Sequence, residues 1–191
     1  MIHIIDTFKD FKNNFQHNLD LSIEDKIQLW ESNYIRNYPE LEYICKDDFE
    51  SNGYSWRDIA ANMVFNRTKD DFSKMLEAYD NILYAINNIT SKVQQVFHIE
   101  IDINIVLYSG LCNSAGWVTR YAGKRAVLFG IDKIAKLGWH TLDKIEPLIA
   151  HELCHVIHFA IRGEDDLNIS IERNTFNKGL WSIYEEGFAQ F

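Results

Sequence analysis

The spacing of apolar residues changes near residue 98, and this change limits the possible folds more than any other feature of the chain. From Ile99 to Leu107 every second residue is apolar, which predicts a half-buried strand. Before it, apolar residues recur every three or four positions, as on the core-facing side of a long helix: Phe72, Met75, Leu76, Tyr79, Ile82, Leu83, Ile86, Ile89, Val93 and Val96. The chain therefore predicts an α+β fold with a mainly helical N-terminal half.

Signals for helix starts and ends divide the first hundred residues further. Asp6-Thr7 is a plausible cap, Ser22 followed by Asp25 resembles a capping box, and Ser51-Asn52-Gly53 has turn chemistry. We expect residues 1–97 to form a helical lobe that makes one compact unit with residues 98–191. The expected helices run from about residue 7 to 17, 22 to 37, 39 to 49, 55 to 65 and 68 to 97.

The second half begins with short strands. One begins at Gly116-Trp117-Val118, after a loop rich in Gly, Asn and Ser. The next runs from Ala126 to Gly130, after a turn at Gly123-Lys124. These segments predict a small mixed or antiparallel sheet. The glycines do not match a dinucleotide or phosphate loop.

One helical turn then carries a chemical motif, His151-Glu152-Leu153-Cys154-His155. Residues four apart on a helix lie about 40° apart around the axis and about 6 Å along it, so both imidazoles can reach one metal ion. Glu152 can flank that ion without occupying a ligand position. The flanking residues are apolar, and Pro147 fits the first turn of the helix or a break before the motif. The alternative is a core helix whose histidines are only hydrogen-bonded.

A catalytic zinc takes three protein ligands and leaves one position open, so a third ligand is needed. The segment Trp181–Gln190 has helical apolar spacing and contains the pair Glu185 and Glu186. We favour Glu186, because the small residues Gly187 and Ala189 allow two helices to approach closely. The alternative for this pair is a solvated acidic face.

Two other sources of a third ligand fit less well. His158 lies seven residues after His151, which is about 10 Å along a helix and too far to share one ion. A metzincin would have glycine three residues after the second histidine and histidine six residues after it. This chain has His158 and Ile161 at those positions.

The string from Leu148 to His155, followed by Tyr184 to Ala189, resembles the gluzincin group of zinc metallopeptidases, which includes the thermolysin-like proteases. The Glu-Gly-Phe-Ala string is similar to the third-ligand helix of the aminopeptidase branch. Residues 101–191 also resemble small bacterial proteins described as predicted Zn-dependent proteases.

This resemblance implies a zincin-like fold and a peptidase acting on a peptide or protein substrate. It implies one Zn²⁺ ion bound by His151, His155 and Glu186, with Glu152 as the general base. Gln190 stands where thermolysin-like enzymes place a bracing carboxylate. Cleavage within a chain and cleavage at its amino terminus both remain open.

The resemblance also implies a strand at the sheet edge, beside the motif helix, that binds extended peptide. It assigns this role to the segment Ala126, Val127, Leu128 and Phe129. The physical basis would be the unpaired N–H and C=O groups of an edge strand. The alternative is an interior strand without a ligand role.

The net charge is −9, which argues against a nucleic acid partner. No apolar run approaches the roughly 18 residues of a membrane span, and no secretory signal is visible. Three widely separated cysteines suit a reducing cytoplasm, and Cys154 is expected to act as a small core hydrophobe. A rival interpretation of the chain is a protein-interaction or regulatory module with a structural or vestigial zinc site.

Overall fold

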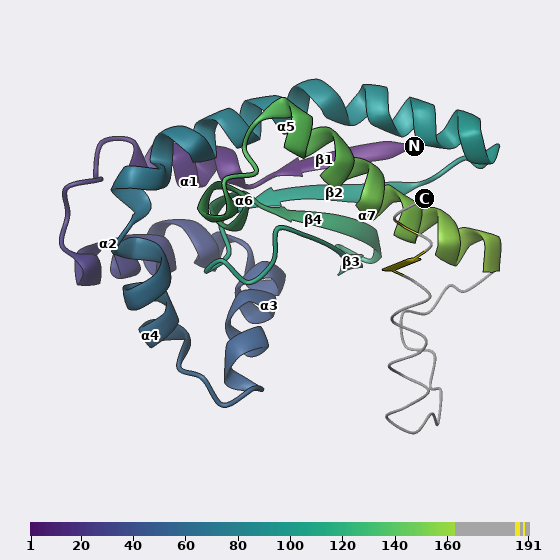
Figure 1. Cartoon of the computed structure of the whole chain (residues 1–191). Coiled ribbons are helices and arrows are strands. Elements are labelled where there is room, and N and C mark those ends of the chain that lie inside the picture. Colours follow the sequence, from purple (N-terminus) through teal and green to yellow (C-terminus); the bar gives the residue numbers. More distant parts are fainter. Residues whose placement is uncertain (163–185, 188, 190–191) are drawn as a thin grey trace.

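The computed structural model describes residues 1–162, 186–187 and 189. Within these residues the protein has an α+β fold with seven α-helices and one four-stranded mixed sheet (Figure 1). The elements are β1 (Ile2–Asp6), α1 (Phe8–Phe15), α2 (Ile23–Leu29), α3 (Pro39–Glu50), α4 (Trp56–Ile59), α5 (Thr68–Phe97), β2 (Ile103–Tyr108), β3 (Gly116–Tyr121), β4 (Lys124–Gly130), α6 (Ile131–Leu137) and α7 (Leu142–Arg162). Single π-helical turns follow α2 (Trp30–Tyr34) and α4 (Ala60–Phe65), and a 3₁₀ turn covers Ile35–Asn37.

The sheet has the strand order β1-β2-β4-β3. β1 pairs parallel with β2, β2 pairs parallel with β4, and β3 pairs antiparallel with β4. The expectation that the first hundred residues are helical is wrong at β1. Five residues are too few to show a helical or strand period, and this strand gains its pairing from β2, about a hundred residues later in the chain.

The predicted edge strand is not at the edge. Ala126, Val127, Leu128 and Phe129 belong to β4, which pairs with β2 on one side and β3 on the other. Their backbone groups are therefore used within the sheet, and the basis for assigning them to peptide binding is lost. The strand at the edge beside α7 is β3, which contacts that helix. A hairpin turn at Ala122 and Gly123 reverses the chain and places β3 outside β4.

β2 also differs from its prediction. It begins at Ile103 instead of Ile99, and all six of its residues are buried, so it is covered on both faces instead of one. Asn104, the polar residue in this strand, is satisfied because its side-chain amide donates to the carbonyl of Tyr121 at 2.9 Å. A strand buried on both faces is typical of parallel pairing on both sides.

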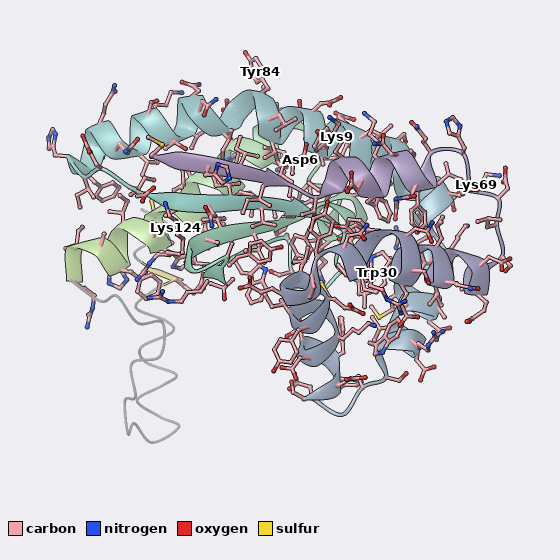
Figure 2. The ribbon with its side chains drawn as sticks, turned by 180° about the vertical axis from the view of Figure 1, so that it is seen from behind. Asp6, Lys9, Trp30, Lys69, Tyr84 and Lys124 are labelled. Carbon is pink, nitrogen blue, oxygen red and sulfur yellow. The ribbon has the colours of Figure 1, made fainter. Side chains whose placement is uncertain are left out.

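The long helix α5 packs against α6 and α7. Figure 1 shows α5 along the β1 side of the sheet and α7 crossing in front of the strands. The predicted stripe faces the core, except that Val96 in the last turn is 72% exposed. Figure 2, seen from behind, shows Tyr84 projecting from α5 away from the body of the molecule.

Helices α1 to α4 gather at one end of the sheet around buried aromatic residues (Figure 1). Two of these residues hold the chain where it leaves β2. The Trp30 indole donates to the carbonyl of Ser109 at 3.0 Å, and the Ser109 amide donates to the Tyr34 hydroxyl at 3.1 Å. The helical region thus fixes the start of the loop between β2 and β3. Of the helices that the structure describes, none combines the length and apolar character that crossing a membrane requires.

Candidate metal centre

Helix α7 carries the His-Glu-x-x-His motif near its middle. The helix begins at Leu142, so Pro147 lies inside it and neither starts nor breaks it, contrary to prediction. A proline removes the hydrogen bond to the carbonyl four residues earlier, here that of Asp143. Pro147 and Asp143 are both exposed, so water can reach this side of the helix.

The side chains of His151, His155 and Glu186 converge on one point. Their ligand atoms all lie within 4.8 Å of one another. The two Nε2 atoms are 3.1 Å apart, and the imidazole rings meet edge to face at 88°. Glu186 places one carboxylate oxygen 3.4 Å from Nε2 of His151 and the other 3.8 Å from Nε2 of His155. These three predicted ligands, two from α7 and one 31 residues later, are brought together.

These distances are compatible with ligands of one shared metal ion. Ligand atoms about 2.0–2.1 Å from a tetrahedral zinc lie roughly 3.3–3.4 Å from one another. Hydrogen bonds between nitrogen and oxygen usually measure about 2.9–3.0 Å, which is shorter than both carboxylate distances here. The contact between the two imidazoles, at 3.1 Å, agrees with either interpretation.

The chemistry of the donor set also suits zinc. Two imidazole nitrogens and one carboxylate oxygen are a ligand set of catalytic zinc sites. Burial, and then the neighbouring His151, lower the pKa of His155 below its ordinary value. This favours the neutral ring, which is the form that binds a metal. The Glu186 side chain is 61% exposed, so the site is open on that side among the described residues.

Glu152 lies beside this cluster but is not part of it. It is 5% exposed and packs against Gly116, the first residue of β3: a Cβ atom on Gly116 would lie 2.6 Å from Oε1 of Glu152. Burial, and then the negative charge of Glu186, raise the pKa of Glu152 to about 7. A carboxylate with a pKa near neutrality is well matched to proton transfer. Sequence reasoning identified Glu152 but not the glycine that makes room for it.

The loop between β2 and β3 is held by a residue that sequence reasoning missed. Asp132, 4% exposed, accepts hydrogen bonds from the amides of Gly110 at 3.2 Å and Cys112 at 2.7 Å. In this loop Leu111 and Cys112 adopt positive φ angles of 60° and 56°. The two amides, one on each side of Leu111, thus turn toward the same carboxylate, and the loop binds this anionic group through its backbone. A lone aspartate after a strand gives no signal of such a role in sequence.

The same loop forms a wall of a cavity of about 910 Å³ that adjoins the cluster. Residues 113–116 lie on one side of it, and Lys133, Leu137 and Trp139 line it from α6 and the following turn. Helix α7 contributes residues from Asp143 to Cys154, including His151 and Glu152, and Ala189 completes the lining. A substrate group in this cavity would therefore contact a candidate metal ligand and the buried carboxylate.

The remaining residues that the sequence singled out lie in different places. Cys154 is 9% exposed, consistent with a small hydrophobic side chain, and it lines the cavity. His158 is 2% exposed and is not among the residues that line the cavity. Glu185 and Gln190 lie outside the described residues.

Comparison with known proteins adds no relative. No family model, curated protein or solved structure matches this chain.

Proposed function

We propose that this protein is a zinc-dependent peptidase with a zincin-like arrangement of sheet and motif helix. The observation that carries the proposal is the convergence of His151, His155 and Glu186 at separations suited to zinc, with the buried Glu152 beside them. Zinc bound there would polarise the scissile carbonyl and lower the pKa of a bound water toward neutrality.

The protein's own residues would hold the ion and move the proton. Both histidines come from one rigid helix, so their positions are fixed relative to each other. Glu152 would accept a proton from the attacking water and deliver it to the departing amine. Glu152 is buried between α7 and the start of β3, which keeps its carboxyl group out of bulk water. This burial favours both the uptake of a proton and its later release to the amine.

The edge strand β3 offers a docking place for an extended substrate. It contacts α7, and its first residue packs on Glu152. A peptide that paired with the edge of β3 that has no partner strand among the described residues would pass the general base and the metal ligands. This transfers the peptide-binding role from β4, where sequence predicted it, to the neighbouring strand.

The alternative is an interaction or regulatory module with a structural or vestigial zinc site. Structural zinc sites are almost always closed by four protein ligands. The described residues supply three, and a large cavity reaches His151 and Glu152. These two features support a catalytic site over a structural one.

The test combines metal content with peptide cleavage. The purified protein is expected to contain about one zinc per chain and to cleave members of a broad peptide library, as read by mass spectrometry. Glu152→Gln should keep the zinc and lose about 10²–10⁴-fold in rate. Glu146→Gln, which neutralises another carboxylate of the same helix, should change neither.

Two results would contradict the proposal. The first is a Glu152→Gln protein that cleaves at the wild-type rate. The second is a zinc-loaded wild-type protein that cleaves no library member, which would favour the interaction module.

A further inference from the structure

The cavity beside the candidate metal centre extends along helix α7. His151, Pro147 and Lys144 follow one another along the same face of α7 at intervals of four and three residues, and all three line the cavity. Seven residues of helix span about 10 Å, so the cavity extends roughly that far from the metal ligand toward the start of the helix. An extended peptide covers this distance with about three residues.

Its lining also includes large apolar side chains. Leu137 and Trp139 are 42% and 41% exposed, and both line the cavity. The Trp139 amide donates to the carbonyl of Ile134, and Gly138 closes helix α6 with a φ of 71°, so the turn that carries Trp139 is fixed. Two large apolar side chains exposed in one cavity suit an apolar group of a ligand.

Two lysines also line the cavity. Lys133 comes from α6 and is half-buried, and Lys144 comes from the first turn of α7 and is exposed. Neither forms an ion pair with any of the residues that the structure describes. Asp143, the neighbouring carboxylate in the lining, has its pKa lowered by a hydrogen bond from Thr141, so it is charged at neutral pH. Together with Glu152 the lining contains two carboxylates and two lysines, so Lys133 and Lys144 supply its only ammonium groups among the described residues, in a protein whose net charge is −9.

We propose that this cavity selects peptides with a carboxylate two or three residues from the scissile bond and a large apolar side chain close to that carboxylate. Lys133 and Lys144 bind the carboxylate, and the wall of Leu137 and Trp139 contacts the apolar side chain. The inference rests on the proposed peptidase function and names its substrate class. The carboxylate belongs either to an Asp or Glu side chain or to the C-terminus of the substrate.

Binding can be measured without cleavage. The probes are fluorescent peptides with one leucine or phenylalanine and a Glu placed one to four residues away, each paired with the same peptide carrying Gln. Their affinity for the zinc-loaded Glu152→Gln protein is read by fluorescence anisotropy. The Glu peptides with the right spacing should bind about fivefold more tightly than their Gln partners, and 0.5 M NaCl should remove most of this preference. Peptides ending in a free acid or an amide show which source of carboxylate is used.

Variants of the residues that line the cavity show which side chains cause the preference for Glu over Gln peptides. Lys144→Gln and Lys133→Gln should each reduce the Glu-to-Gln ratio to about twofold or less, and the double change to Glu should reverse it. Lys136→Gln is the matched control, since Lys136 lies on α6, three residues after Lys133, but does not line the cavity. Trp139→Ala should weaken Glu and Gln peptides equally, because it removes the apolar contact and leaves the charges.

The outcomes separate this inference from the proposed function. Equal binding of Glu and Gln peptides at every spacing, or an equal loss of preference in Lys136→Gln, would overturn the assignment of the lysines even if the protein cleaves peptides. Cleavage that fails while the charge preference and its loss in Lys144→Gln persist would support the cavity assignment and contradict the peptidase.

Discussion

A single glycine determines where the candidate general base can lie. Gly116 is the first residue of β3, and the carboxylate of Glu152 occupies the space where any other residue would place its Cβ. The atoms that a Cβ on Gly116 would meet are those of the Glu152 carboxyl group and the carbon next to it. Since Glu152 is almost fully buried, it has little room to move aside.

Gly116→Ala is therefore expected to displace Glu152 without touching the metal ligands. We expect hydrolysis to fall by about 10²-fold, zinc affinity to change less than about twofold, and the free energy of unfolding to fall by about 1–2 kcal/mol. Cleavage assays, metal titration and urea unfolding measure the three quantities. Thr119→Ala, a small change on the same strand, is the control, and equal activity of the two variants would contradict the role given to Gly116.

Glu186 makes a second residue-scale prediction. Glu186→Gln replaces a charged oxygen ligand with a neutral amide, so the dissociation constant for zinc should rise by about 10²-fold or more. The comparison variant is Glu77→Gln. Glu77 is similarly exposed and also lies 3.8 Å from a histidine, His140, but it belongs to no cluster of three ligands among the described residues. If both variants bound zinc like the wild type, Glu186 would not be a ligand.

At the scale of elements, the loop between β2 and β3 connects the core to the site. Asp132 at the start of α6 holds the loop at Gly110 and Cys112, and the next residues line the cavity and lead into Gly116. The loop also approaches β4 closely, because a Cβ atom on Gly130 would lie 2.1 Å from the carbonyl oxygen of Ser114. The wall of the cavity is thus fixed by backbone contacts.

Asp132→Asn should loosen this wall. An asparagine has one acceptor oxygen, so its amide group would face one of the two backbone N–H groups that now donate to the carboxylate. Leaving a buried donor without its acceptor should cost about 1–3 kcal/mol of stability. We expect a lower urea midpoint and a higher KM with zinc content unchanged. Asp143→Asn changes an exposed aspartate of the cavity and keeps an acceptor oxygen for Thr141, so it should lower the midpoint much less than Asp132→Asn does.

The stability difference between wild type and Asp132→Asn should also depend on pH. Burial raises the pKa of Asp132 above its ordinary value of 3.8 despite the backbone hydrogen bonds. An acid with a raised pKa in the folded state contributes stability below its unfolded pKa and loses it as the pH rises through the folded pKa. The free-energy advantage of the wild type should therefore be greatest below about pH 4 and shrink above it. Urea unfolding of both proteins across pH 3–8 tests this, and an advantage that grows with pH would contradict it.

The limits of the sequence interpretation are also clearest at this scale. Helix α5 and the motif helix follow from apolar spacing, because each repeats its pattern over several turns. The edge position of β3 does not, since strand order depends on contacts between β1, β2 and β4 that lie far apart in the chain. Helix α6 was missed because its seven residues directly follow a buried strand without a break.

For the whole molecule, the sheet and α5 hold α7 in place, while the proposed third ligand, Glu186, comes from a distant part of the sequence. His151 and His155 could be recognised as a pair from their spacing alone. Glu186 could be favoured as the third ligand but not assigned with certainty from sequence. The string Glu-Gly-Phe-Ala does not determine how its segment packs against the motif helix. The cavity could not be predicted, since its walls come from a loop, α6 and the turn after it, α7, and Ala189 near the end of the chain.

A ligand set drawn from two parts of the chain couples metal binding to global stability. An ion that binds only the folded state stabilises it by RT ln(1 + [L]/Kd), about 4 kcal/mol when free zinc is a thousandfold above Kd. For a chain of this size that corresponds to a rise in Tm of about 10 °C. We expect this rise in thermal unfolding on adding zinc to the metal-free protein, and its reversal by a chelator.

Two variants make this prediction specific to the proposed site. Glu152→Gln leaves all three ligands in place, so it should show the full rise in Tm. His155→Ala removes a ligand from the middle of α7 and should show less than a quarter of it. Both proteins start from their own metal-free Tm, so a general loss of stability in His155→Ala does not enter the comparison. A rise in His155→Ala equal to that of the wild type would mean that zinc stabilises the protein from another site, and the centre at His151, His155 and Glu186 would have to be abandoned.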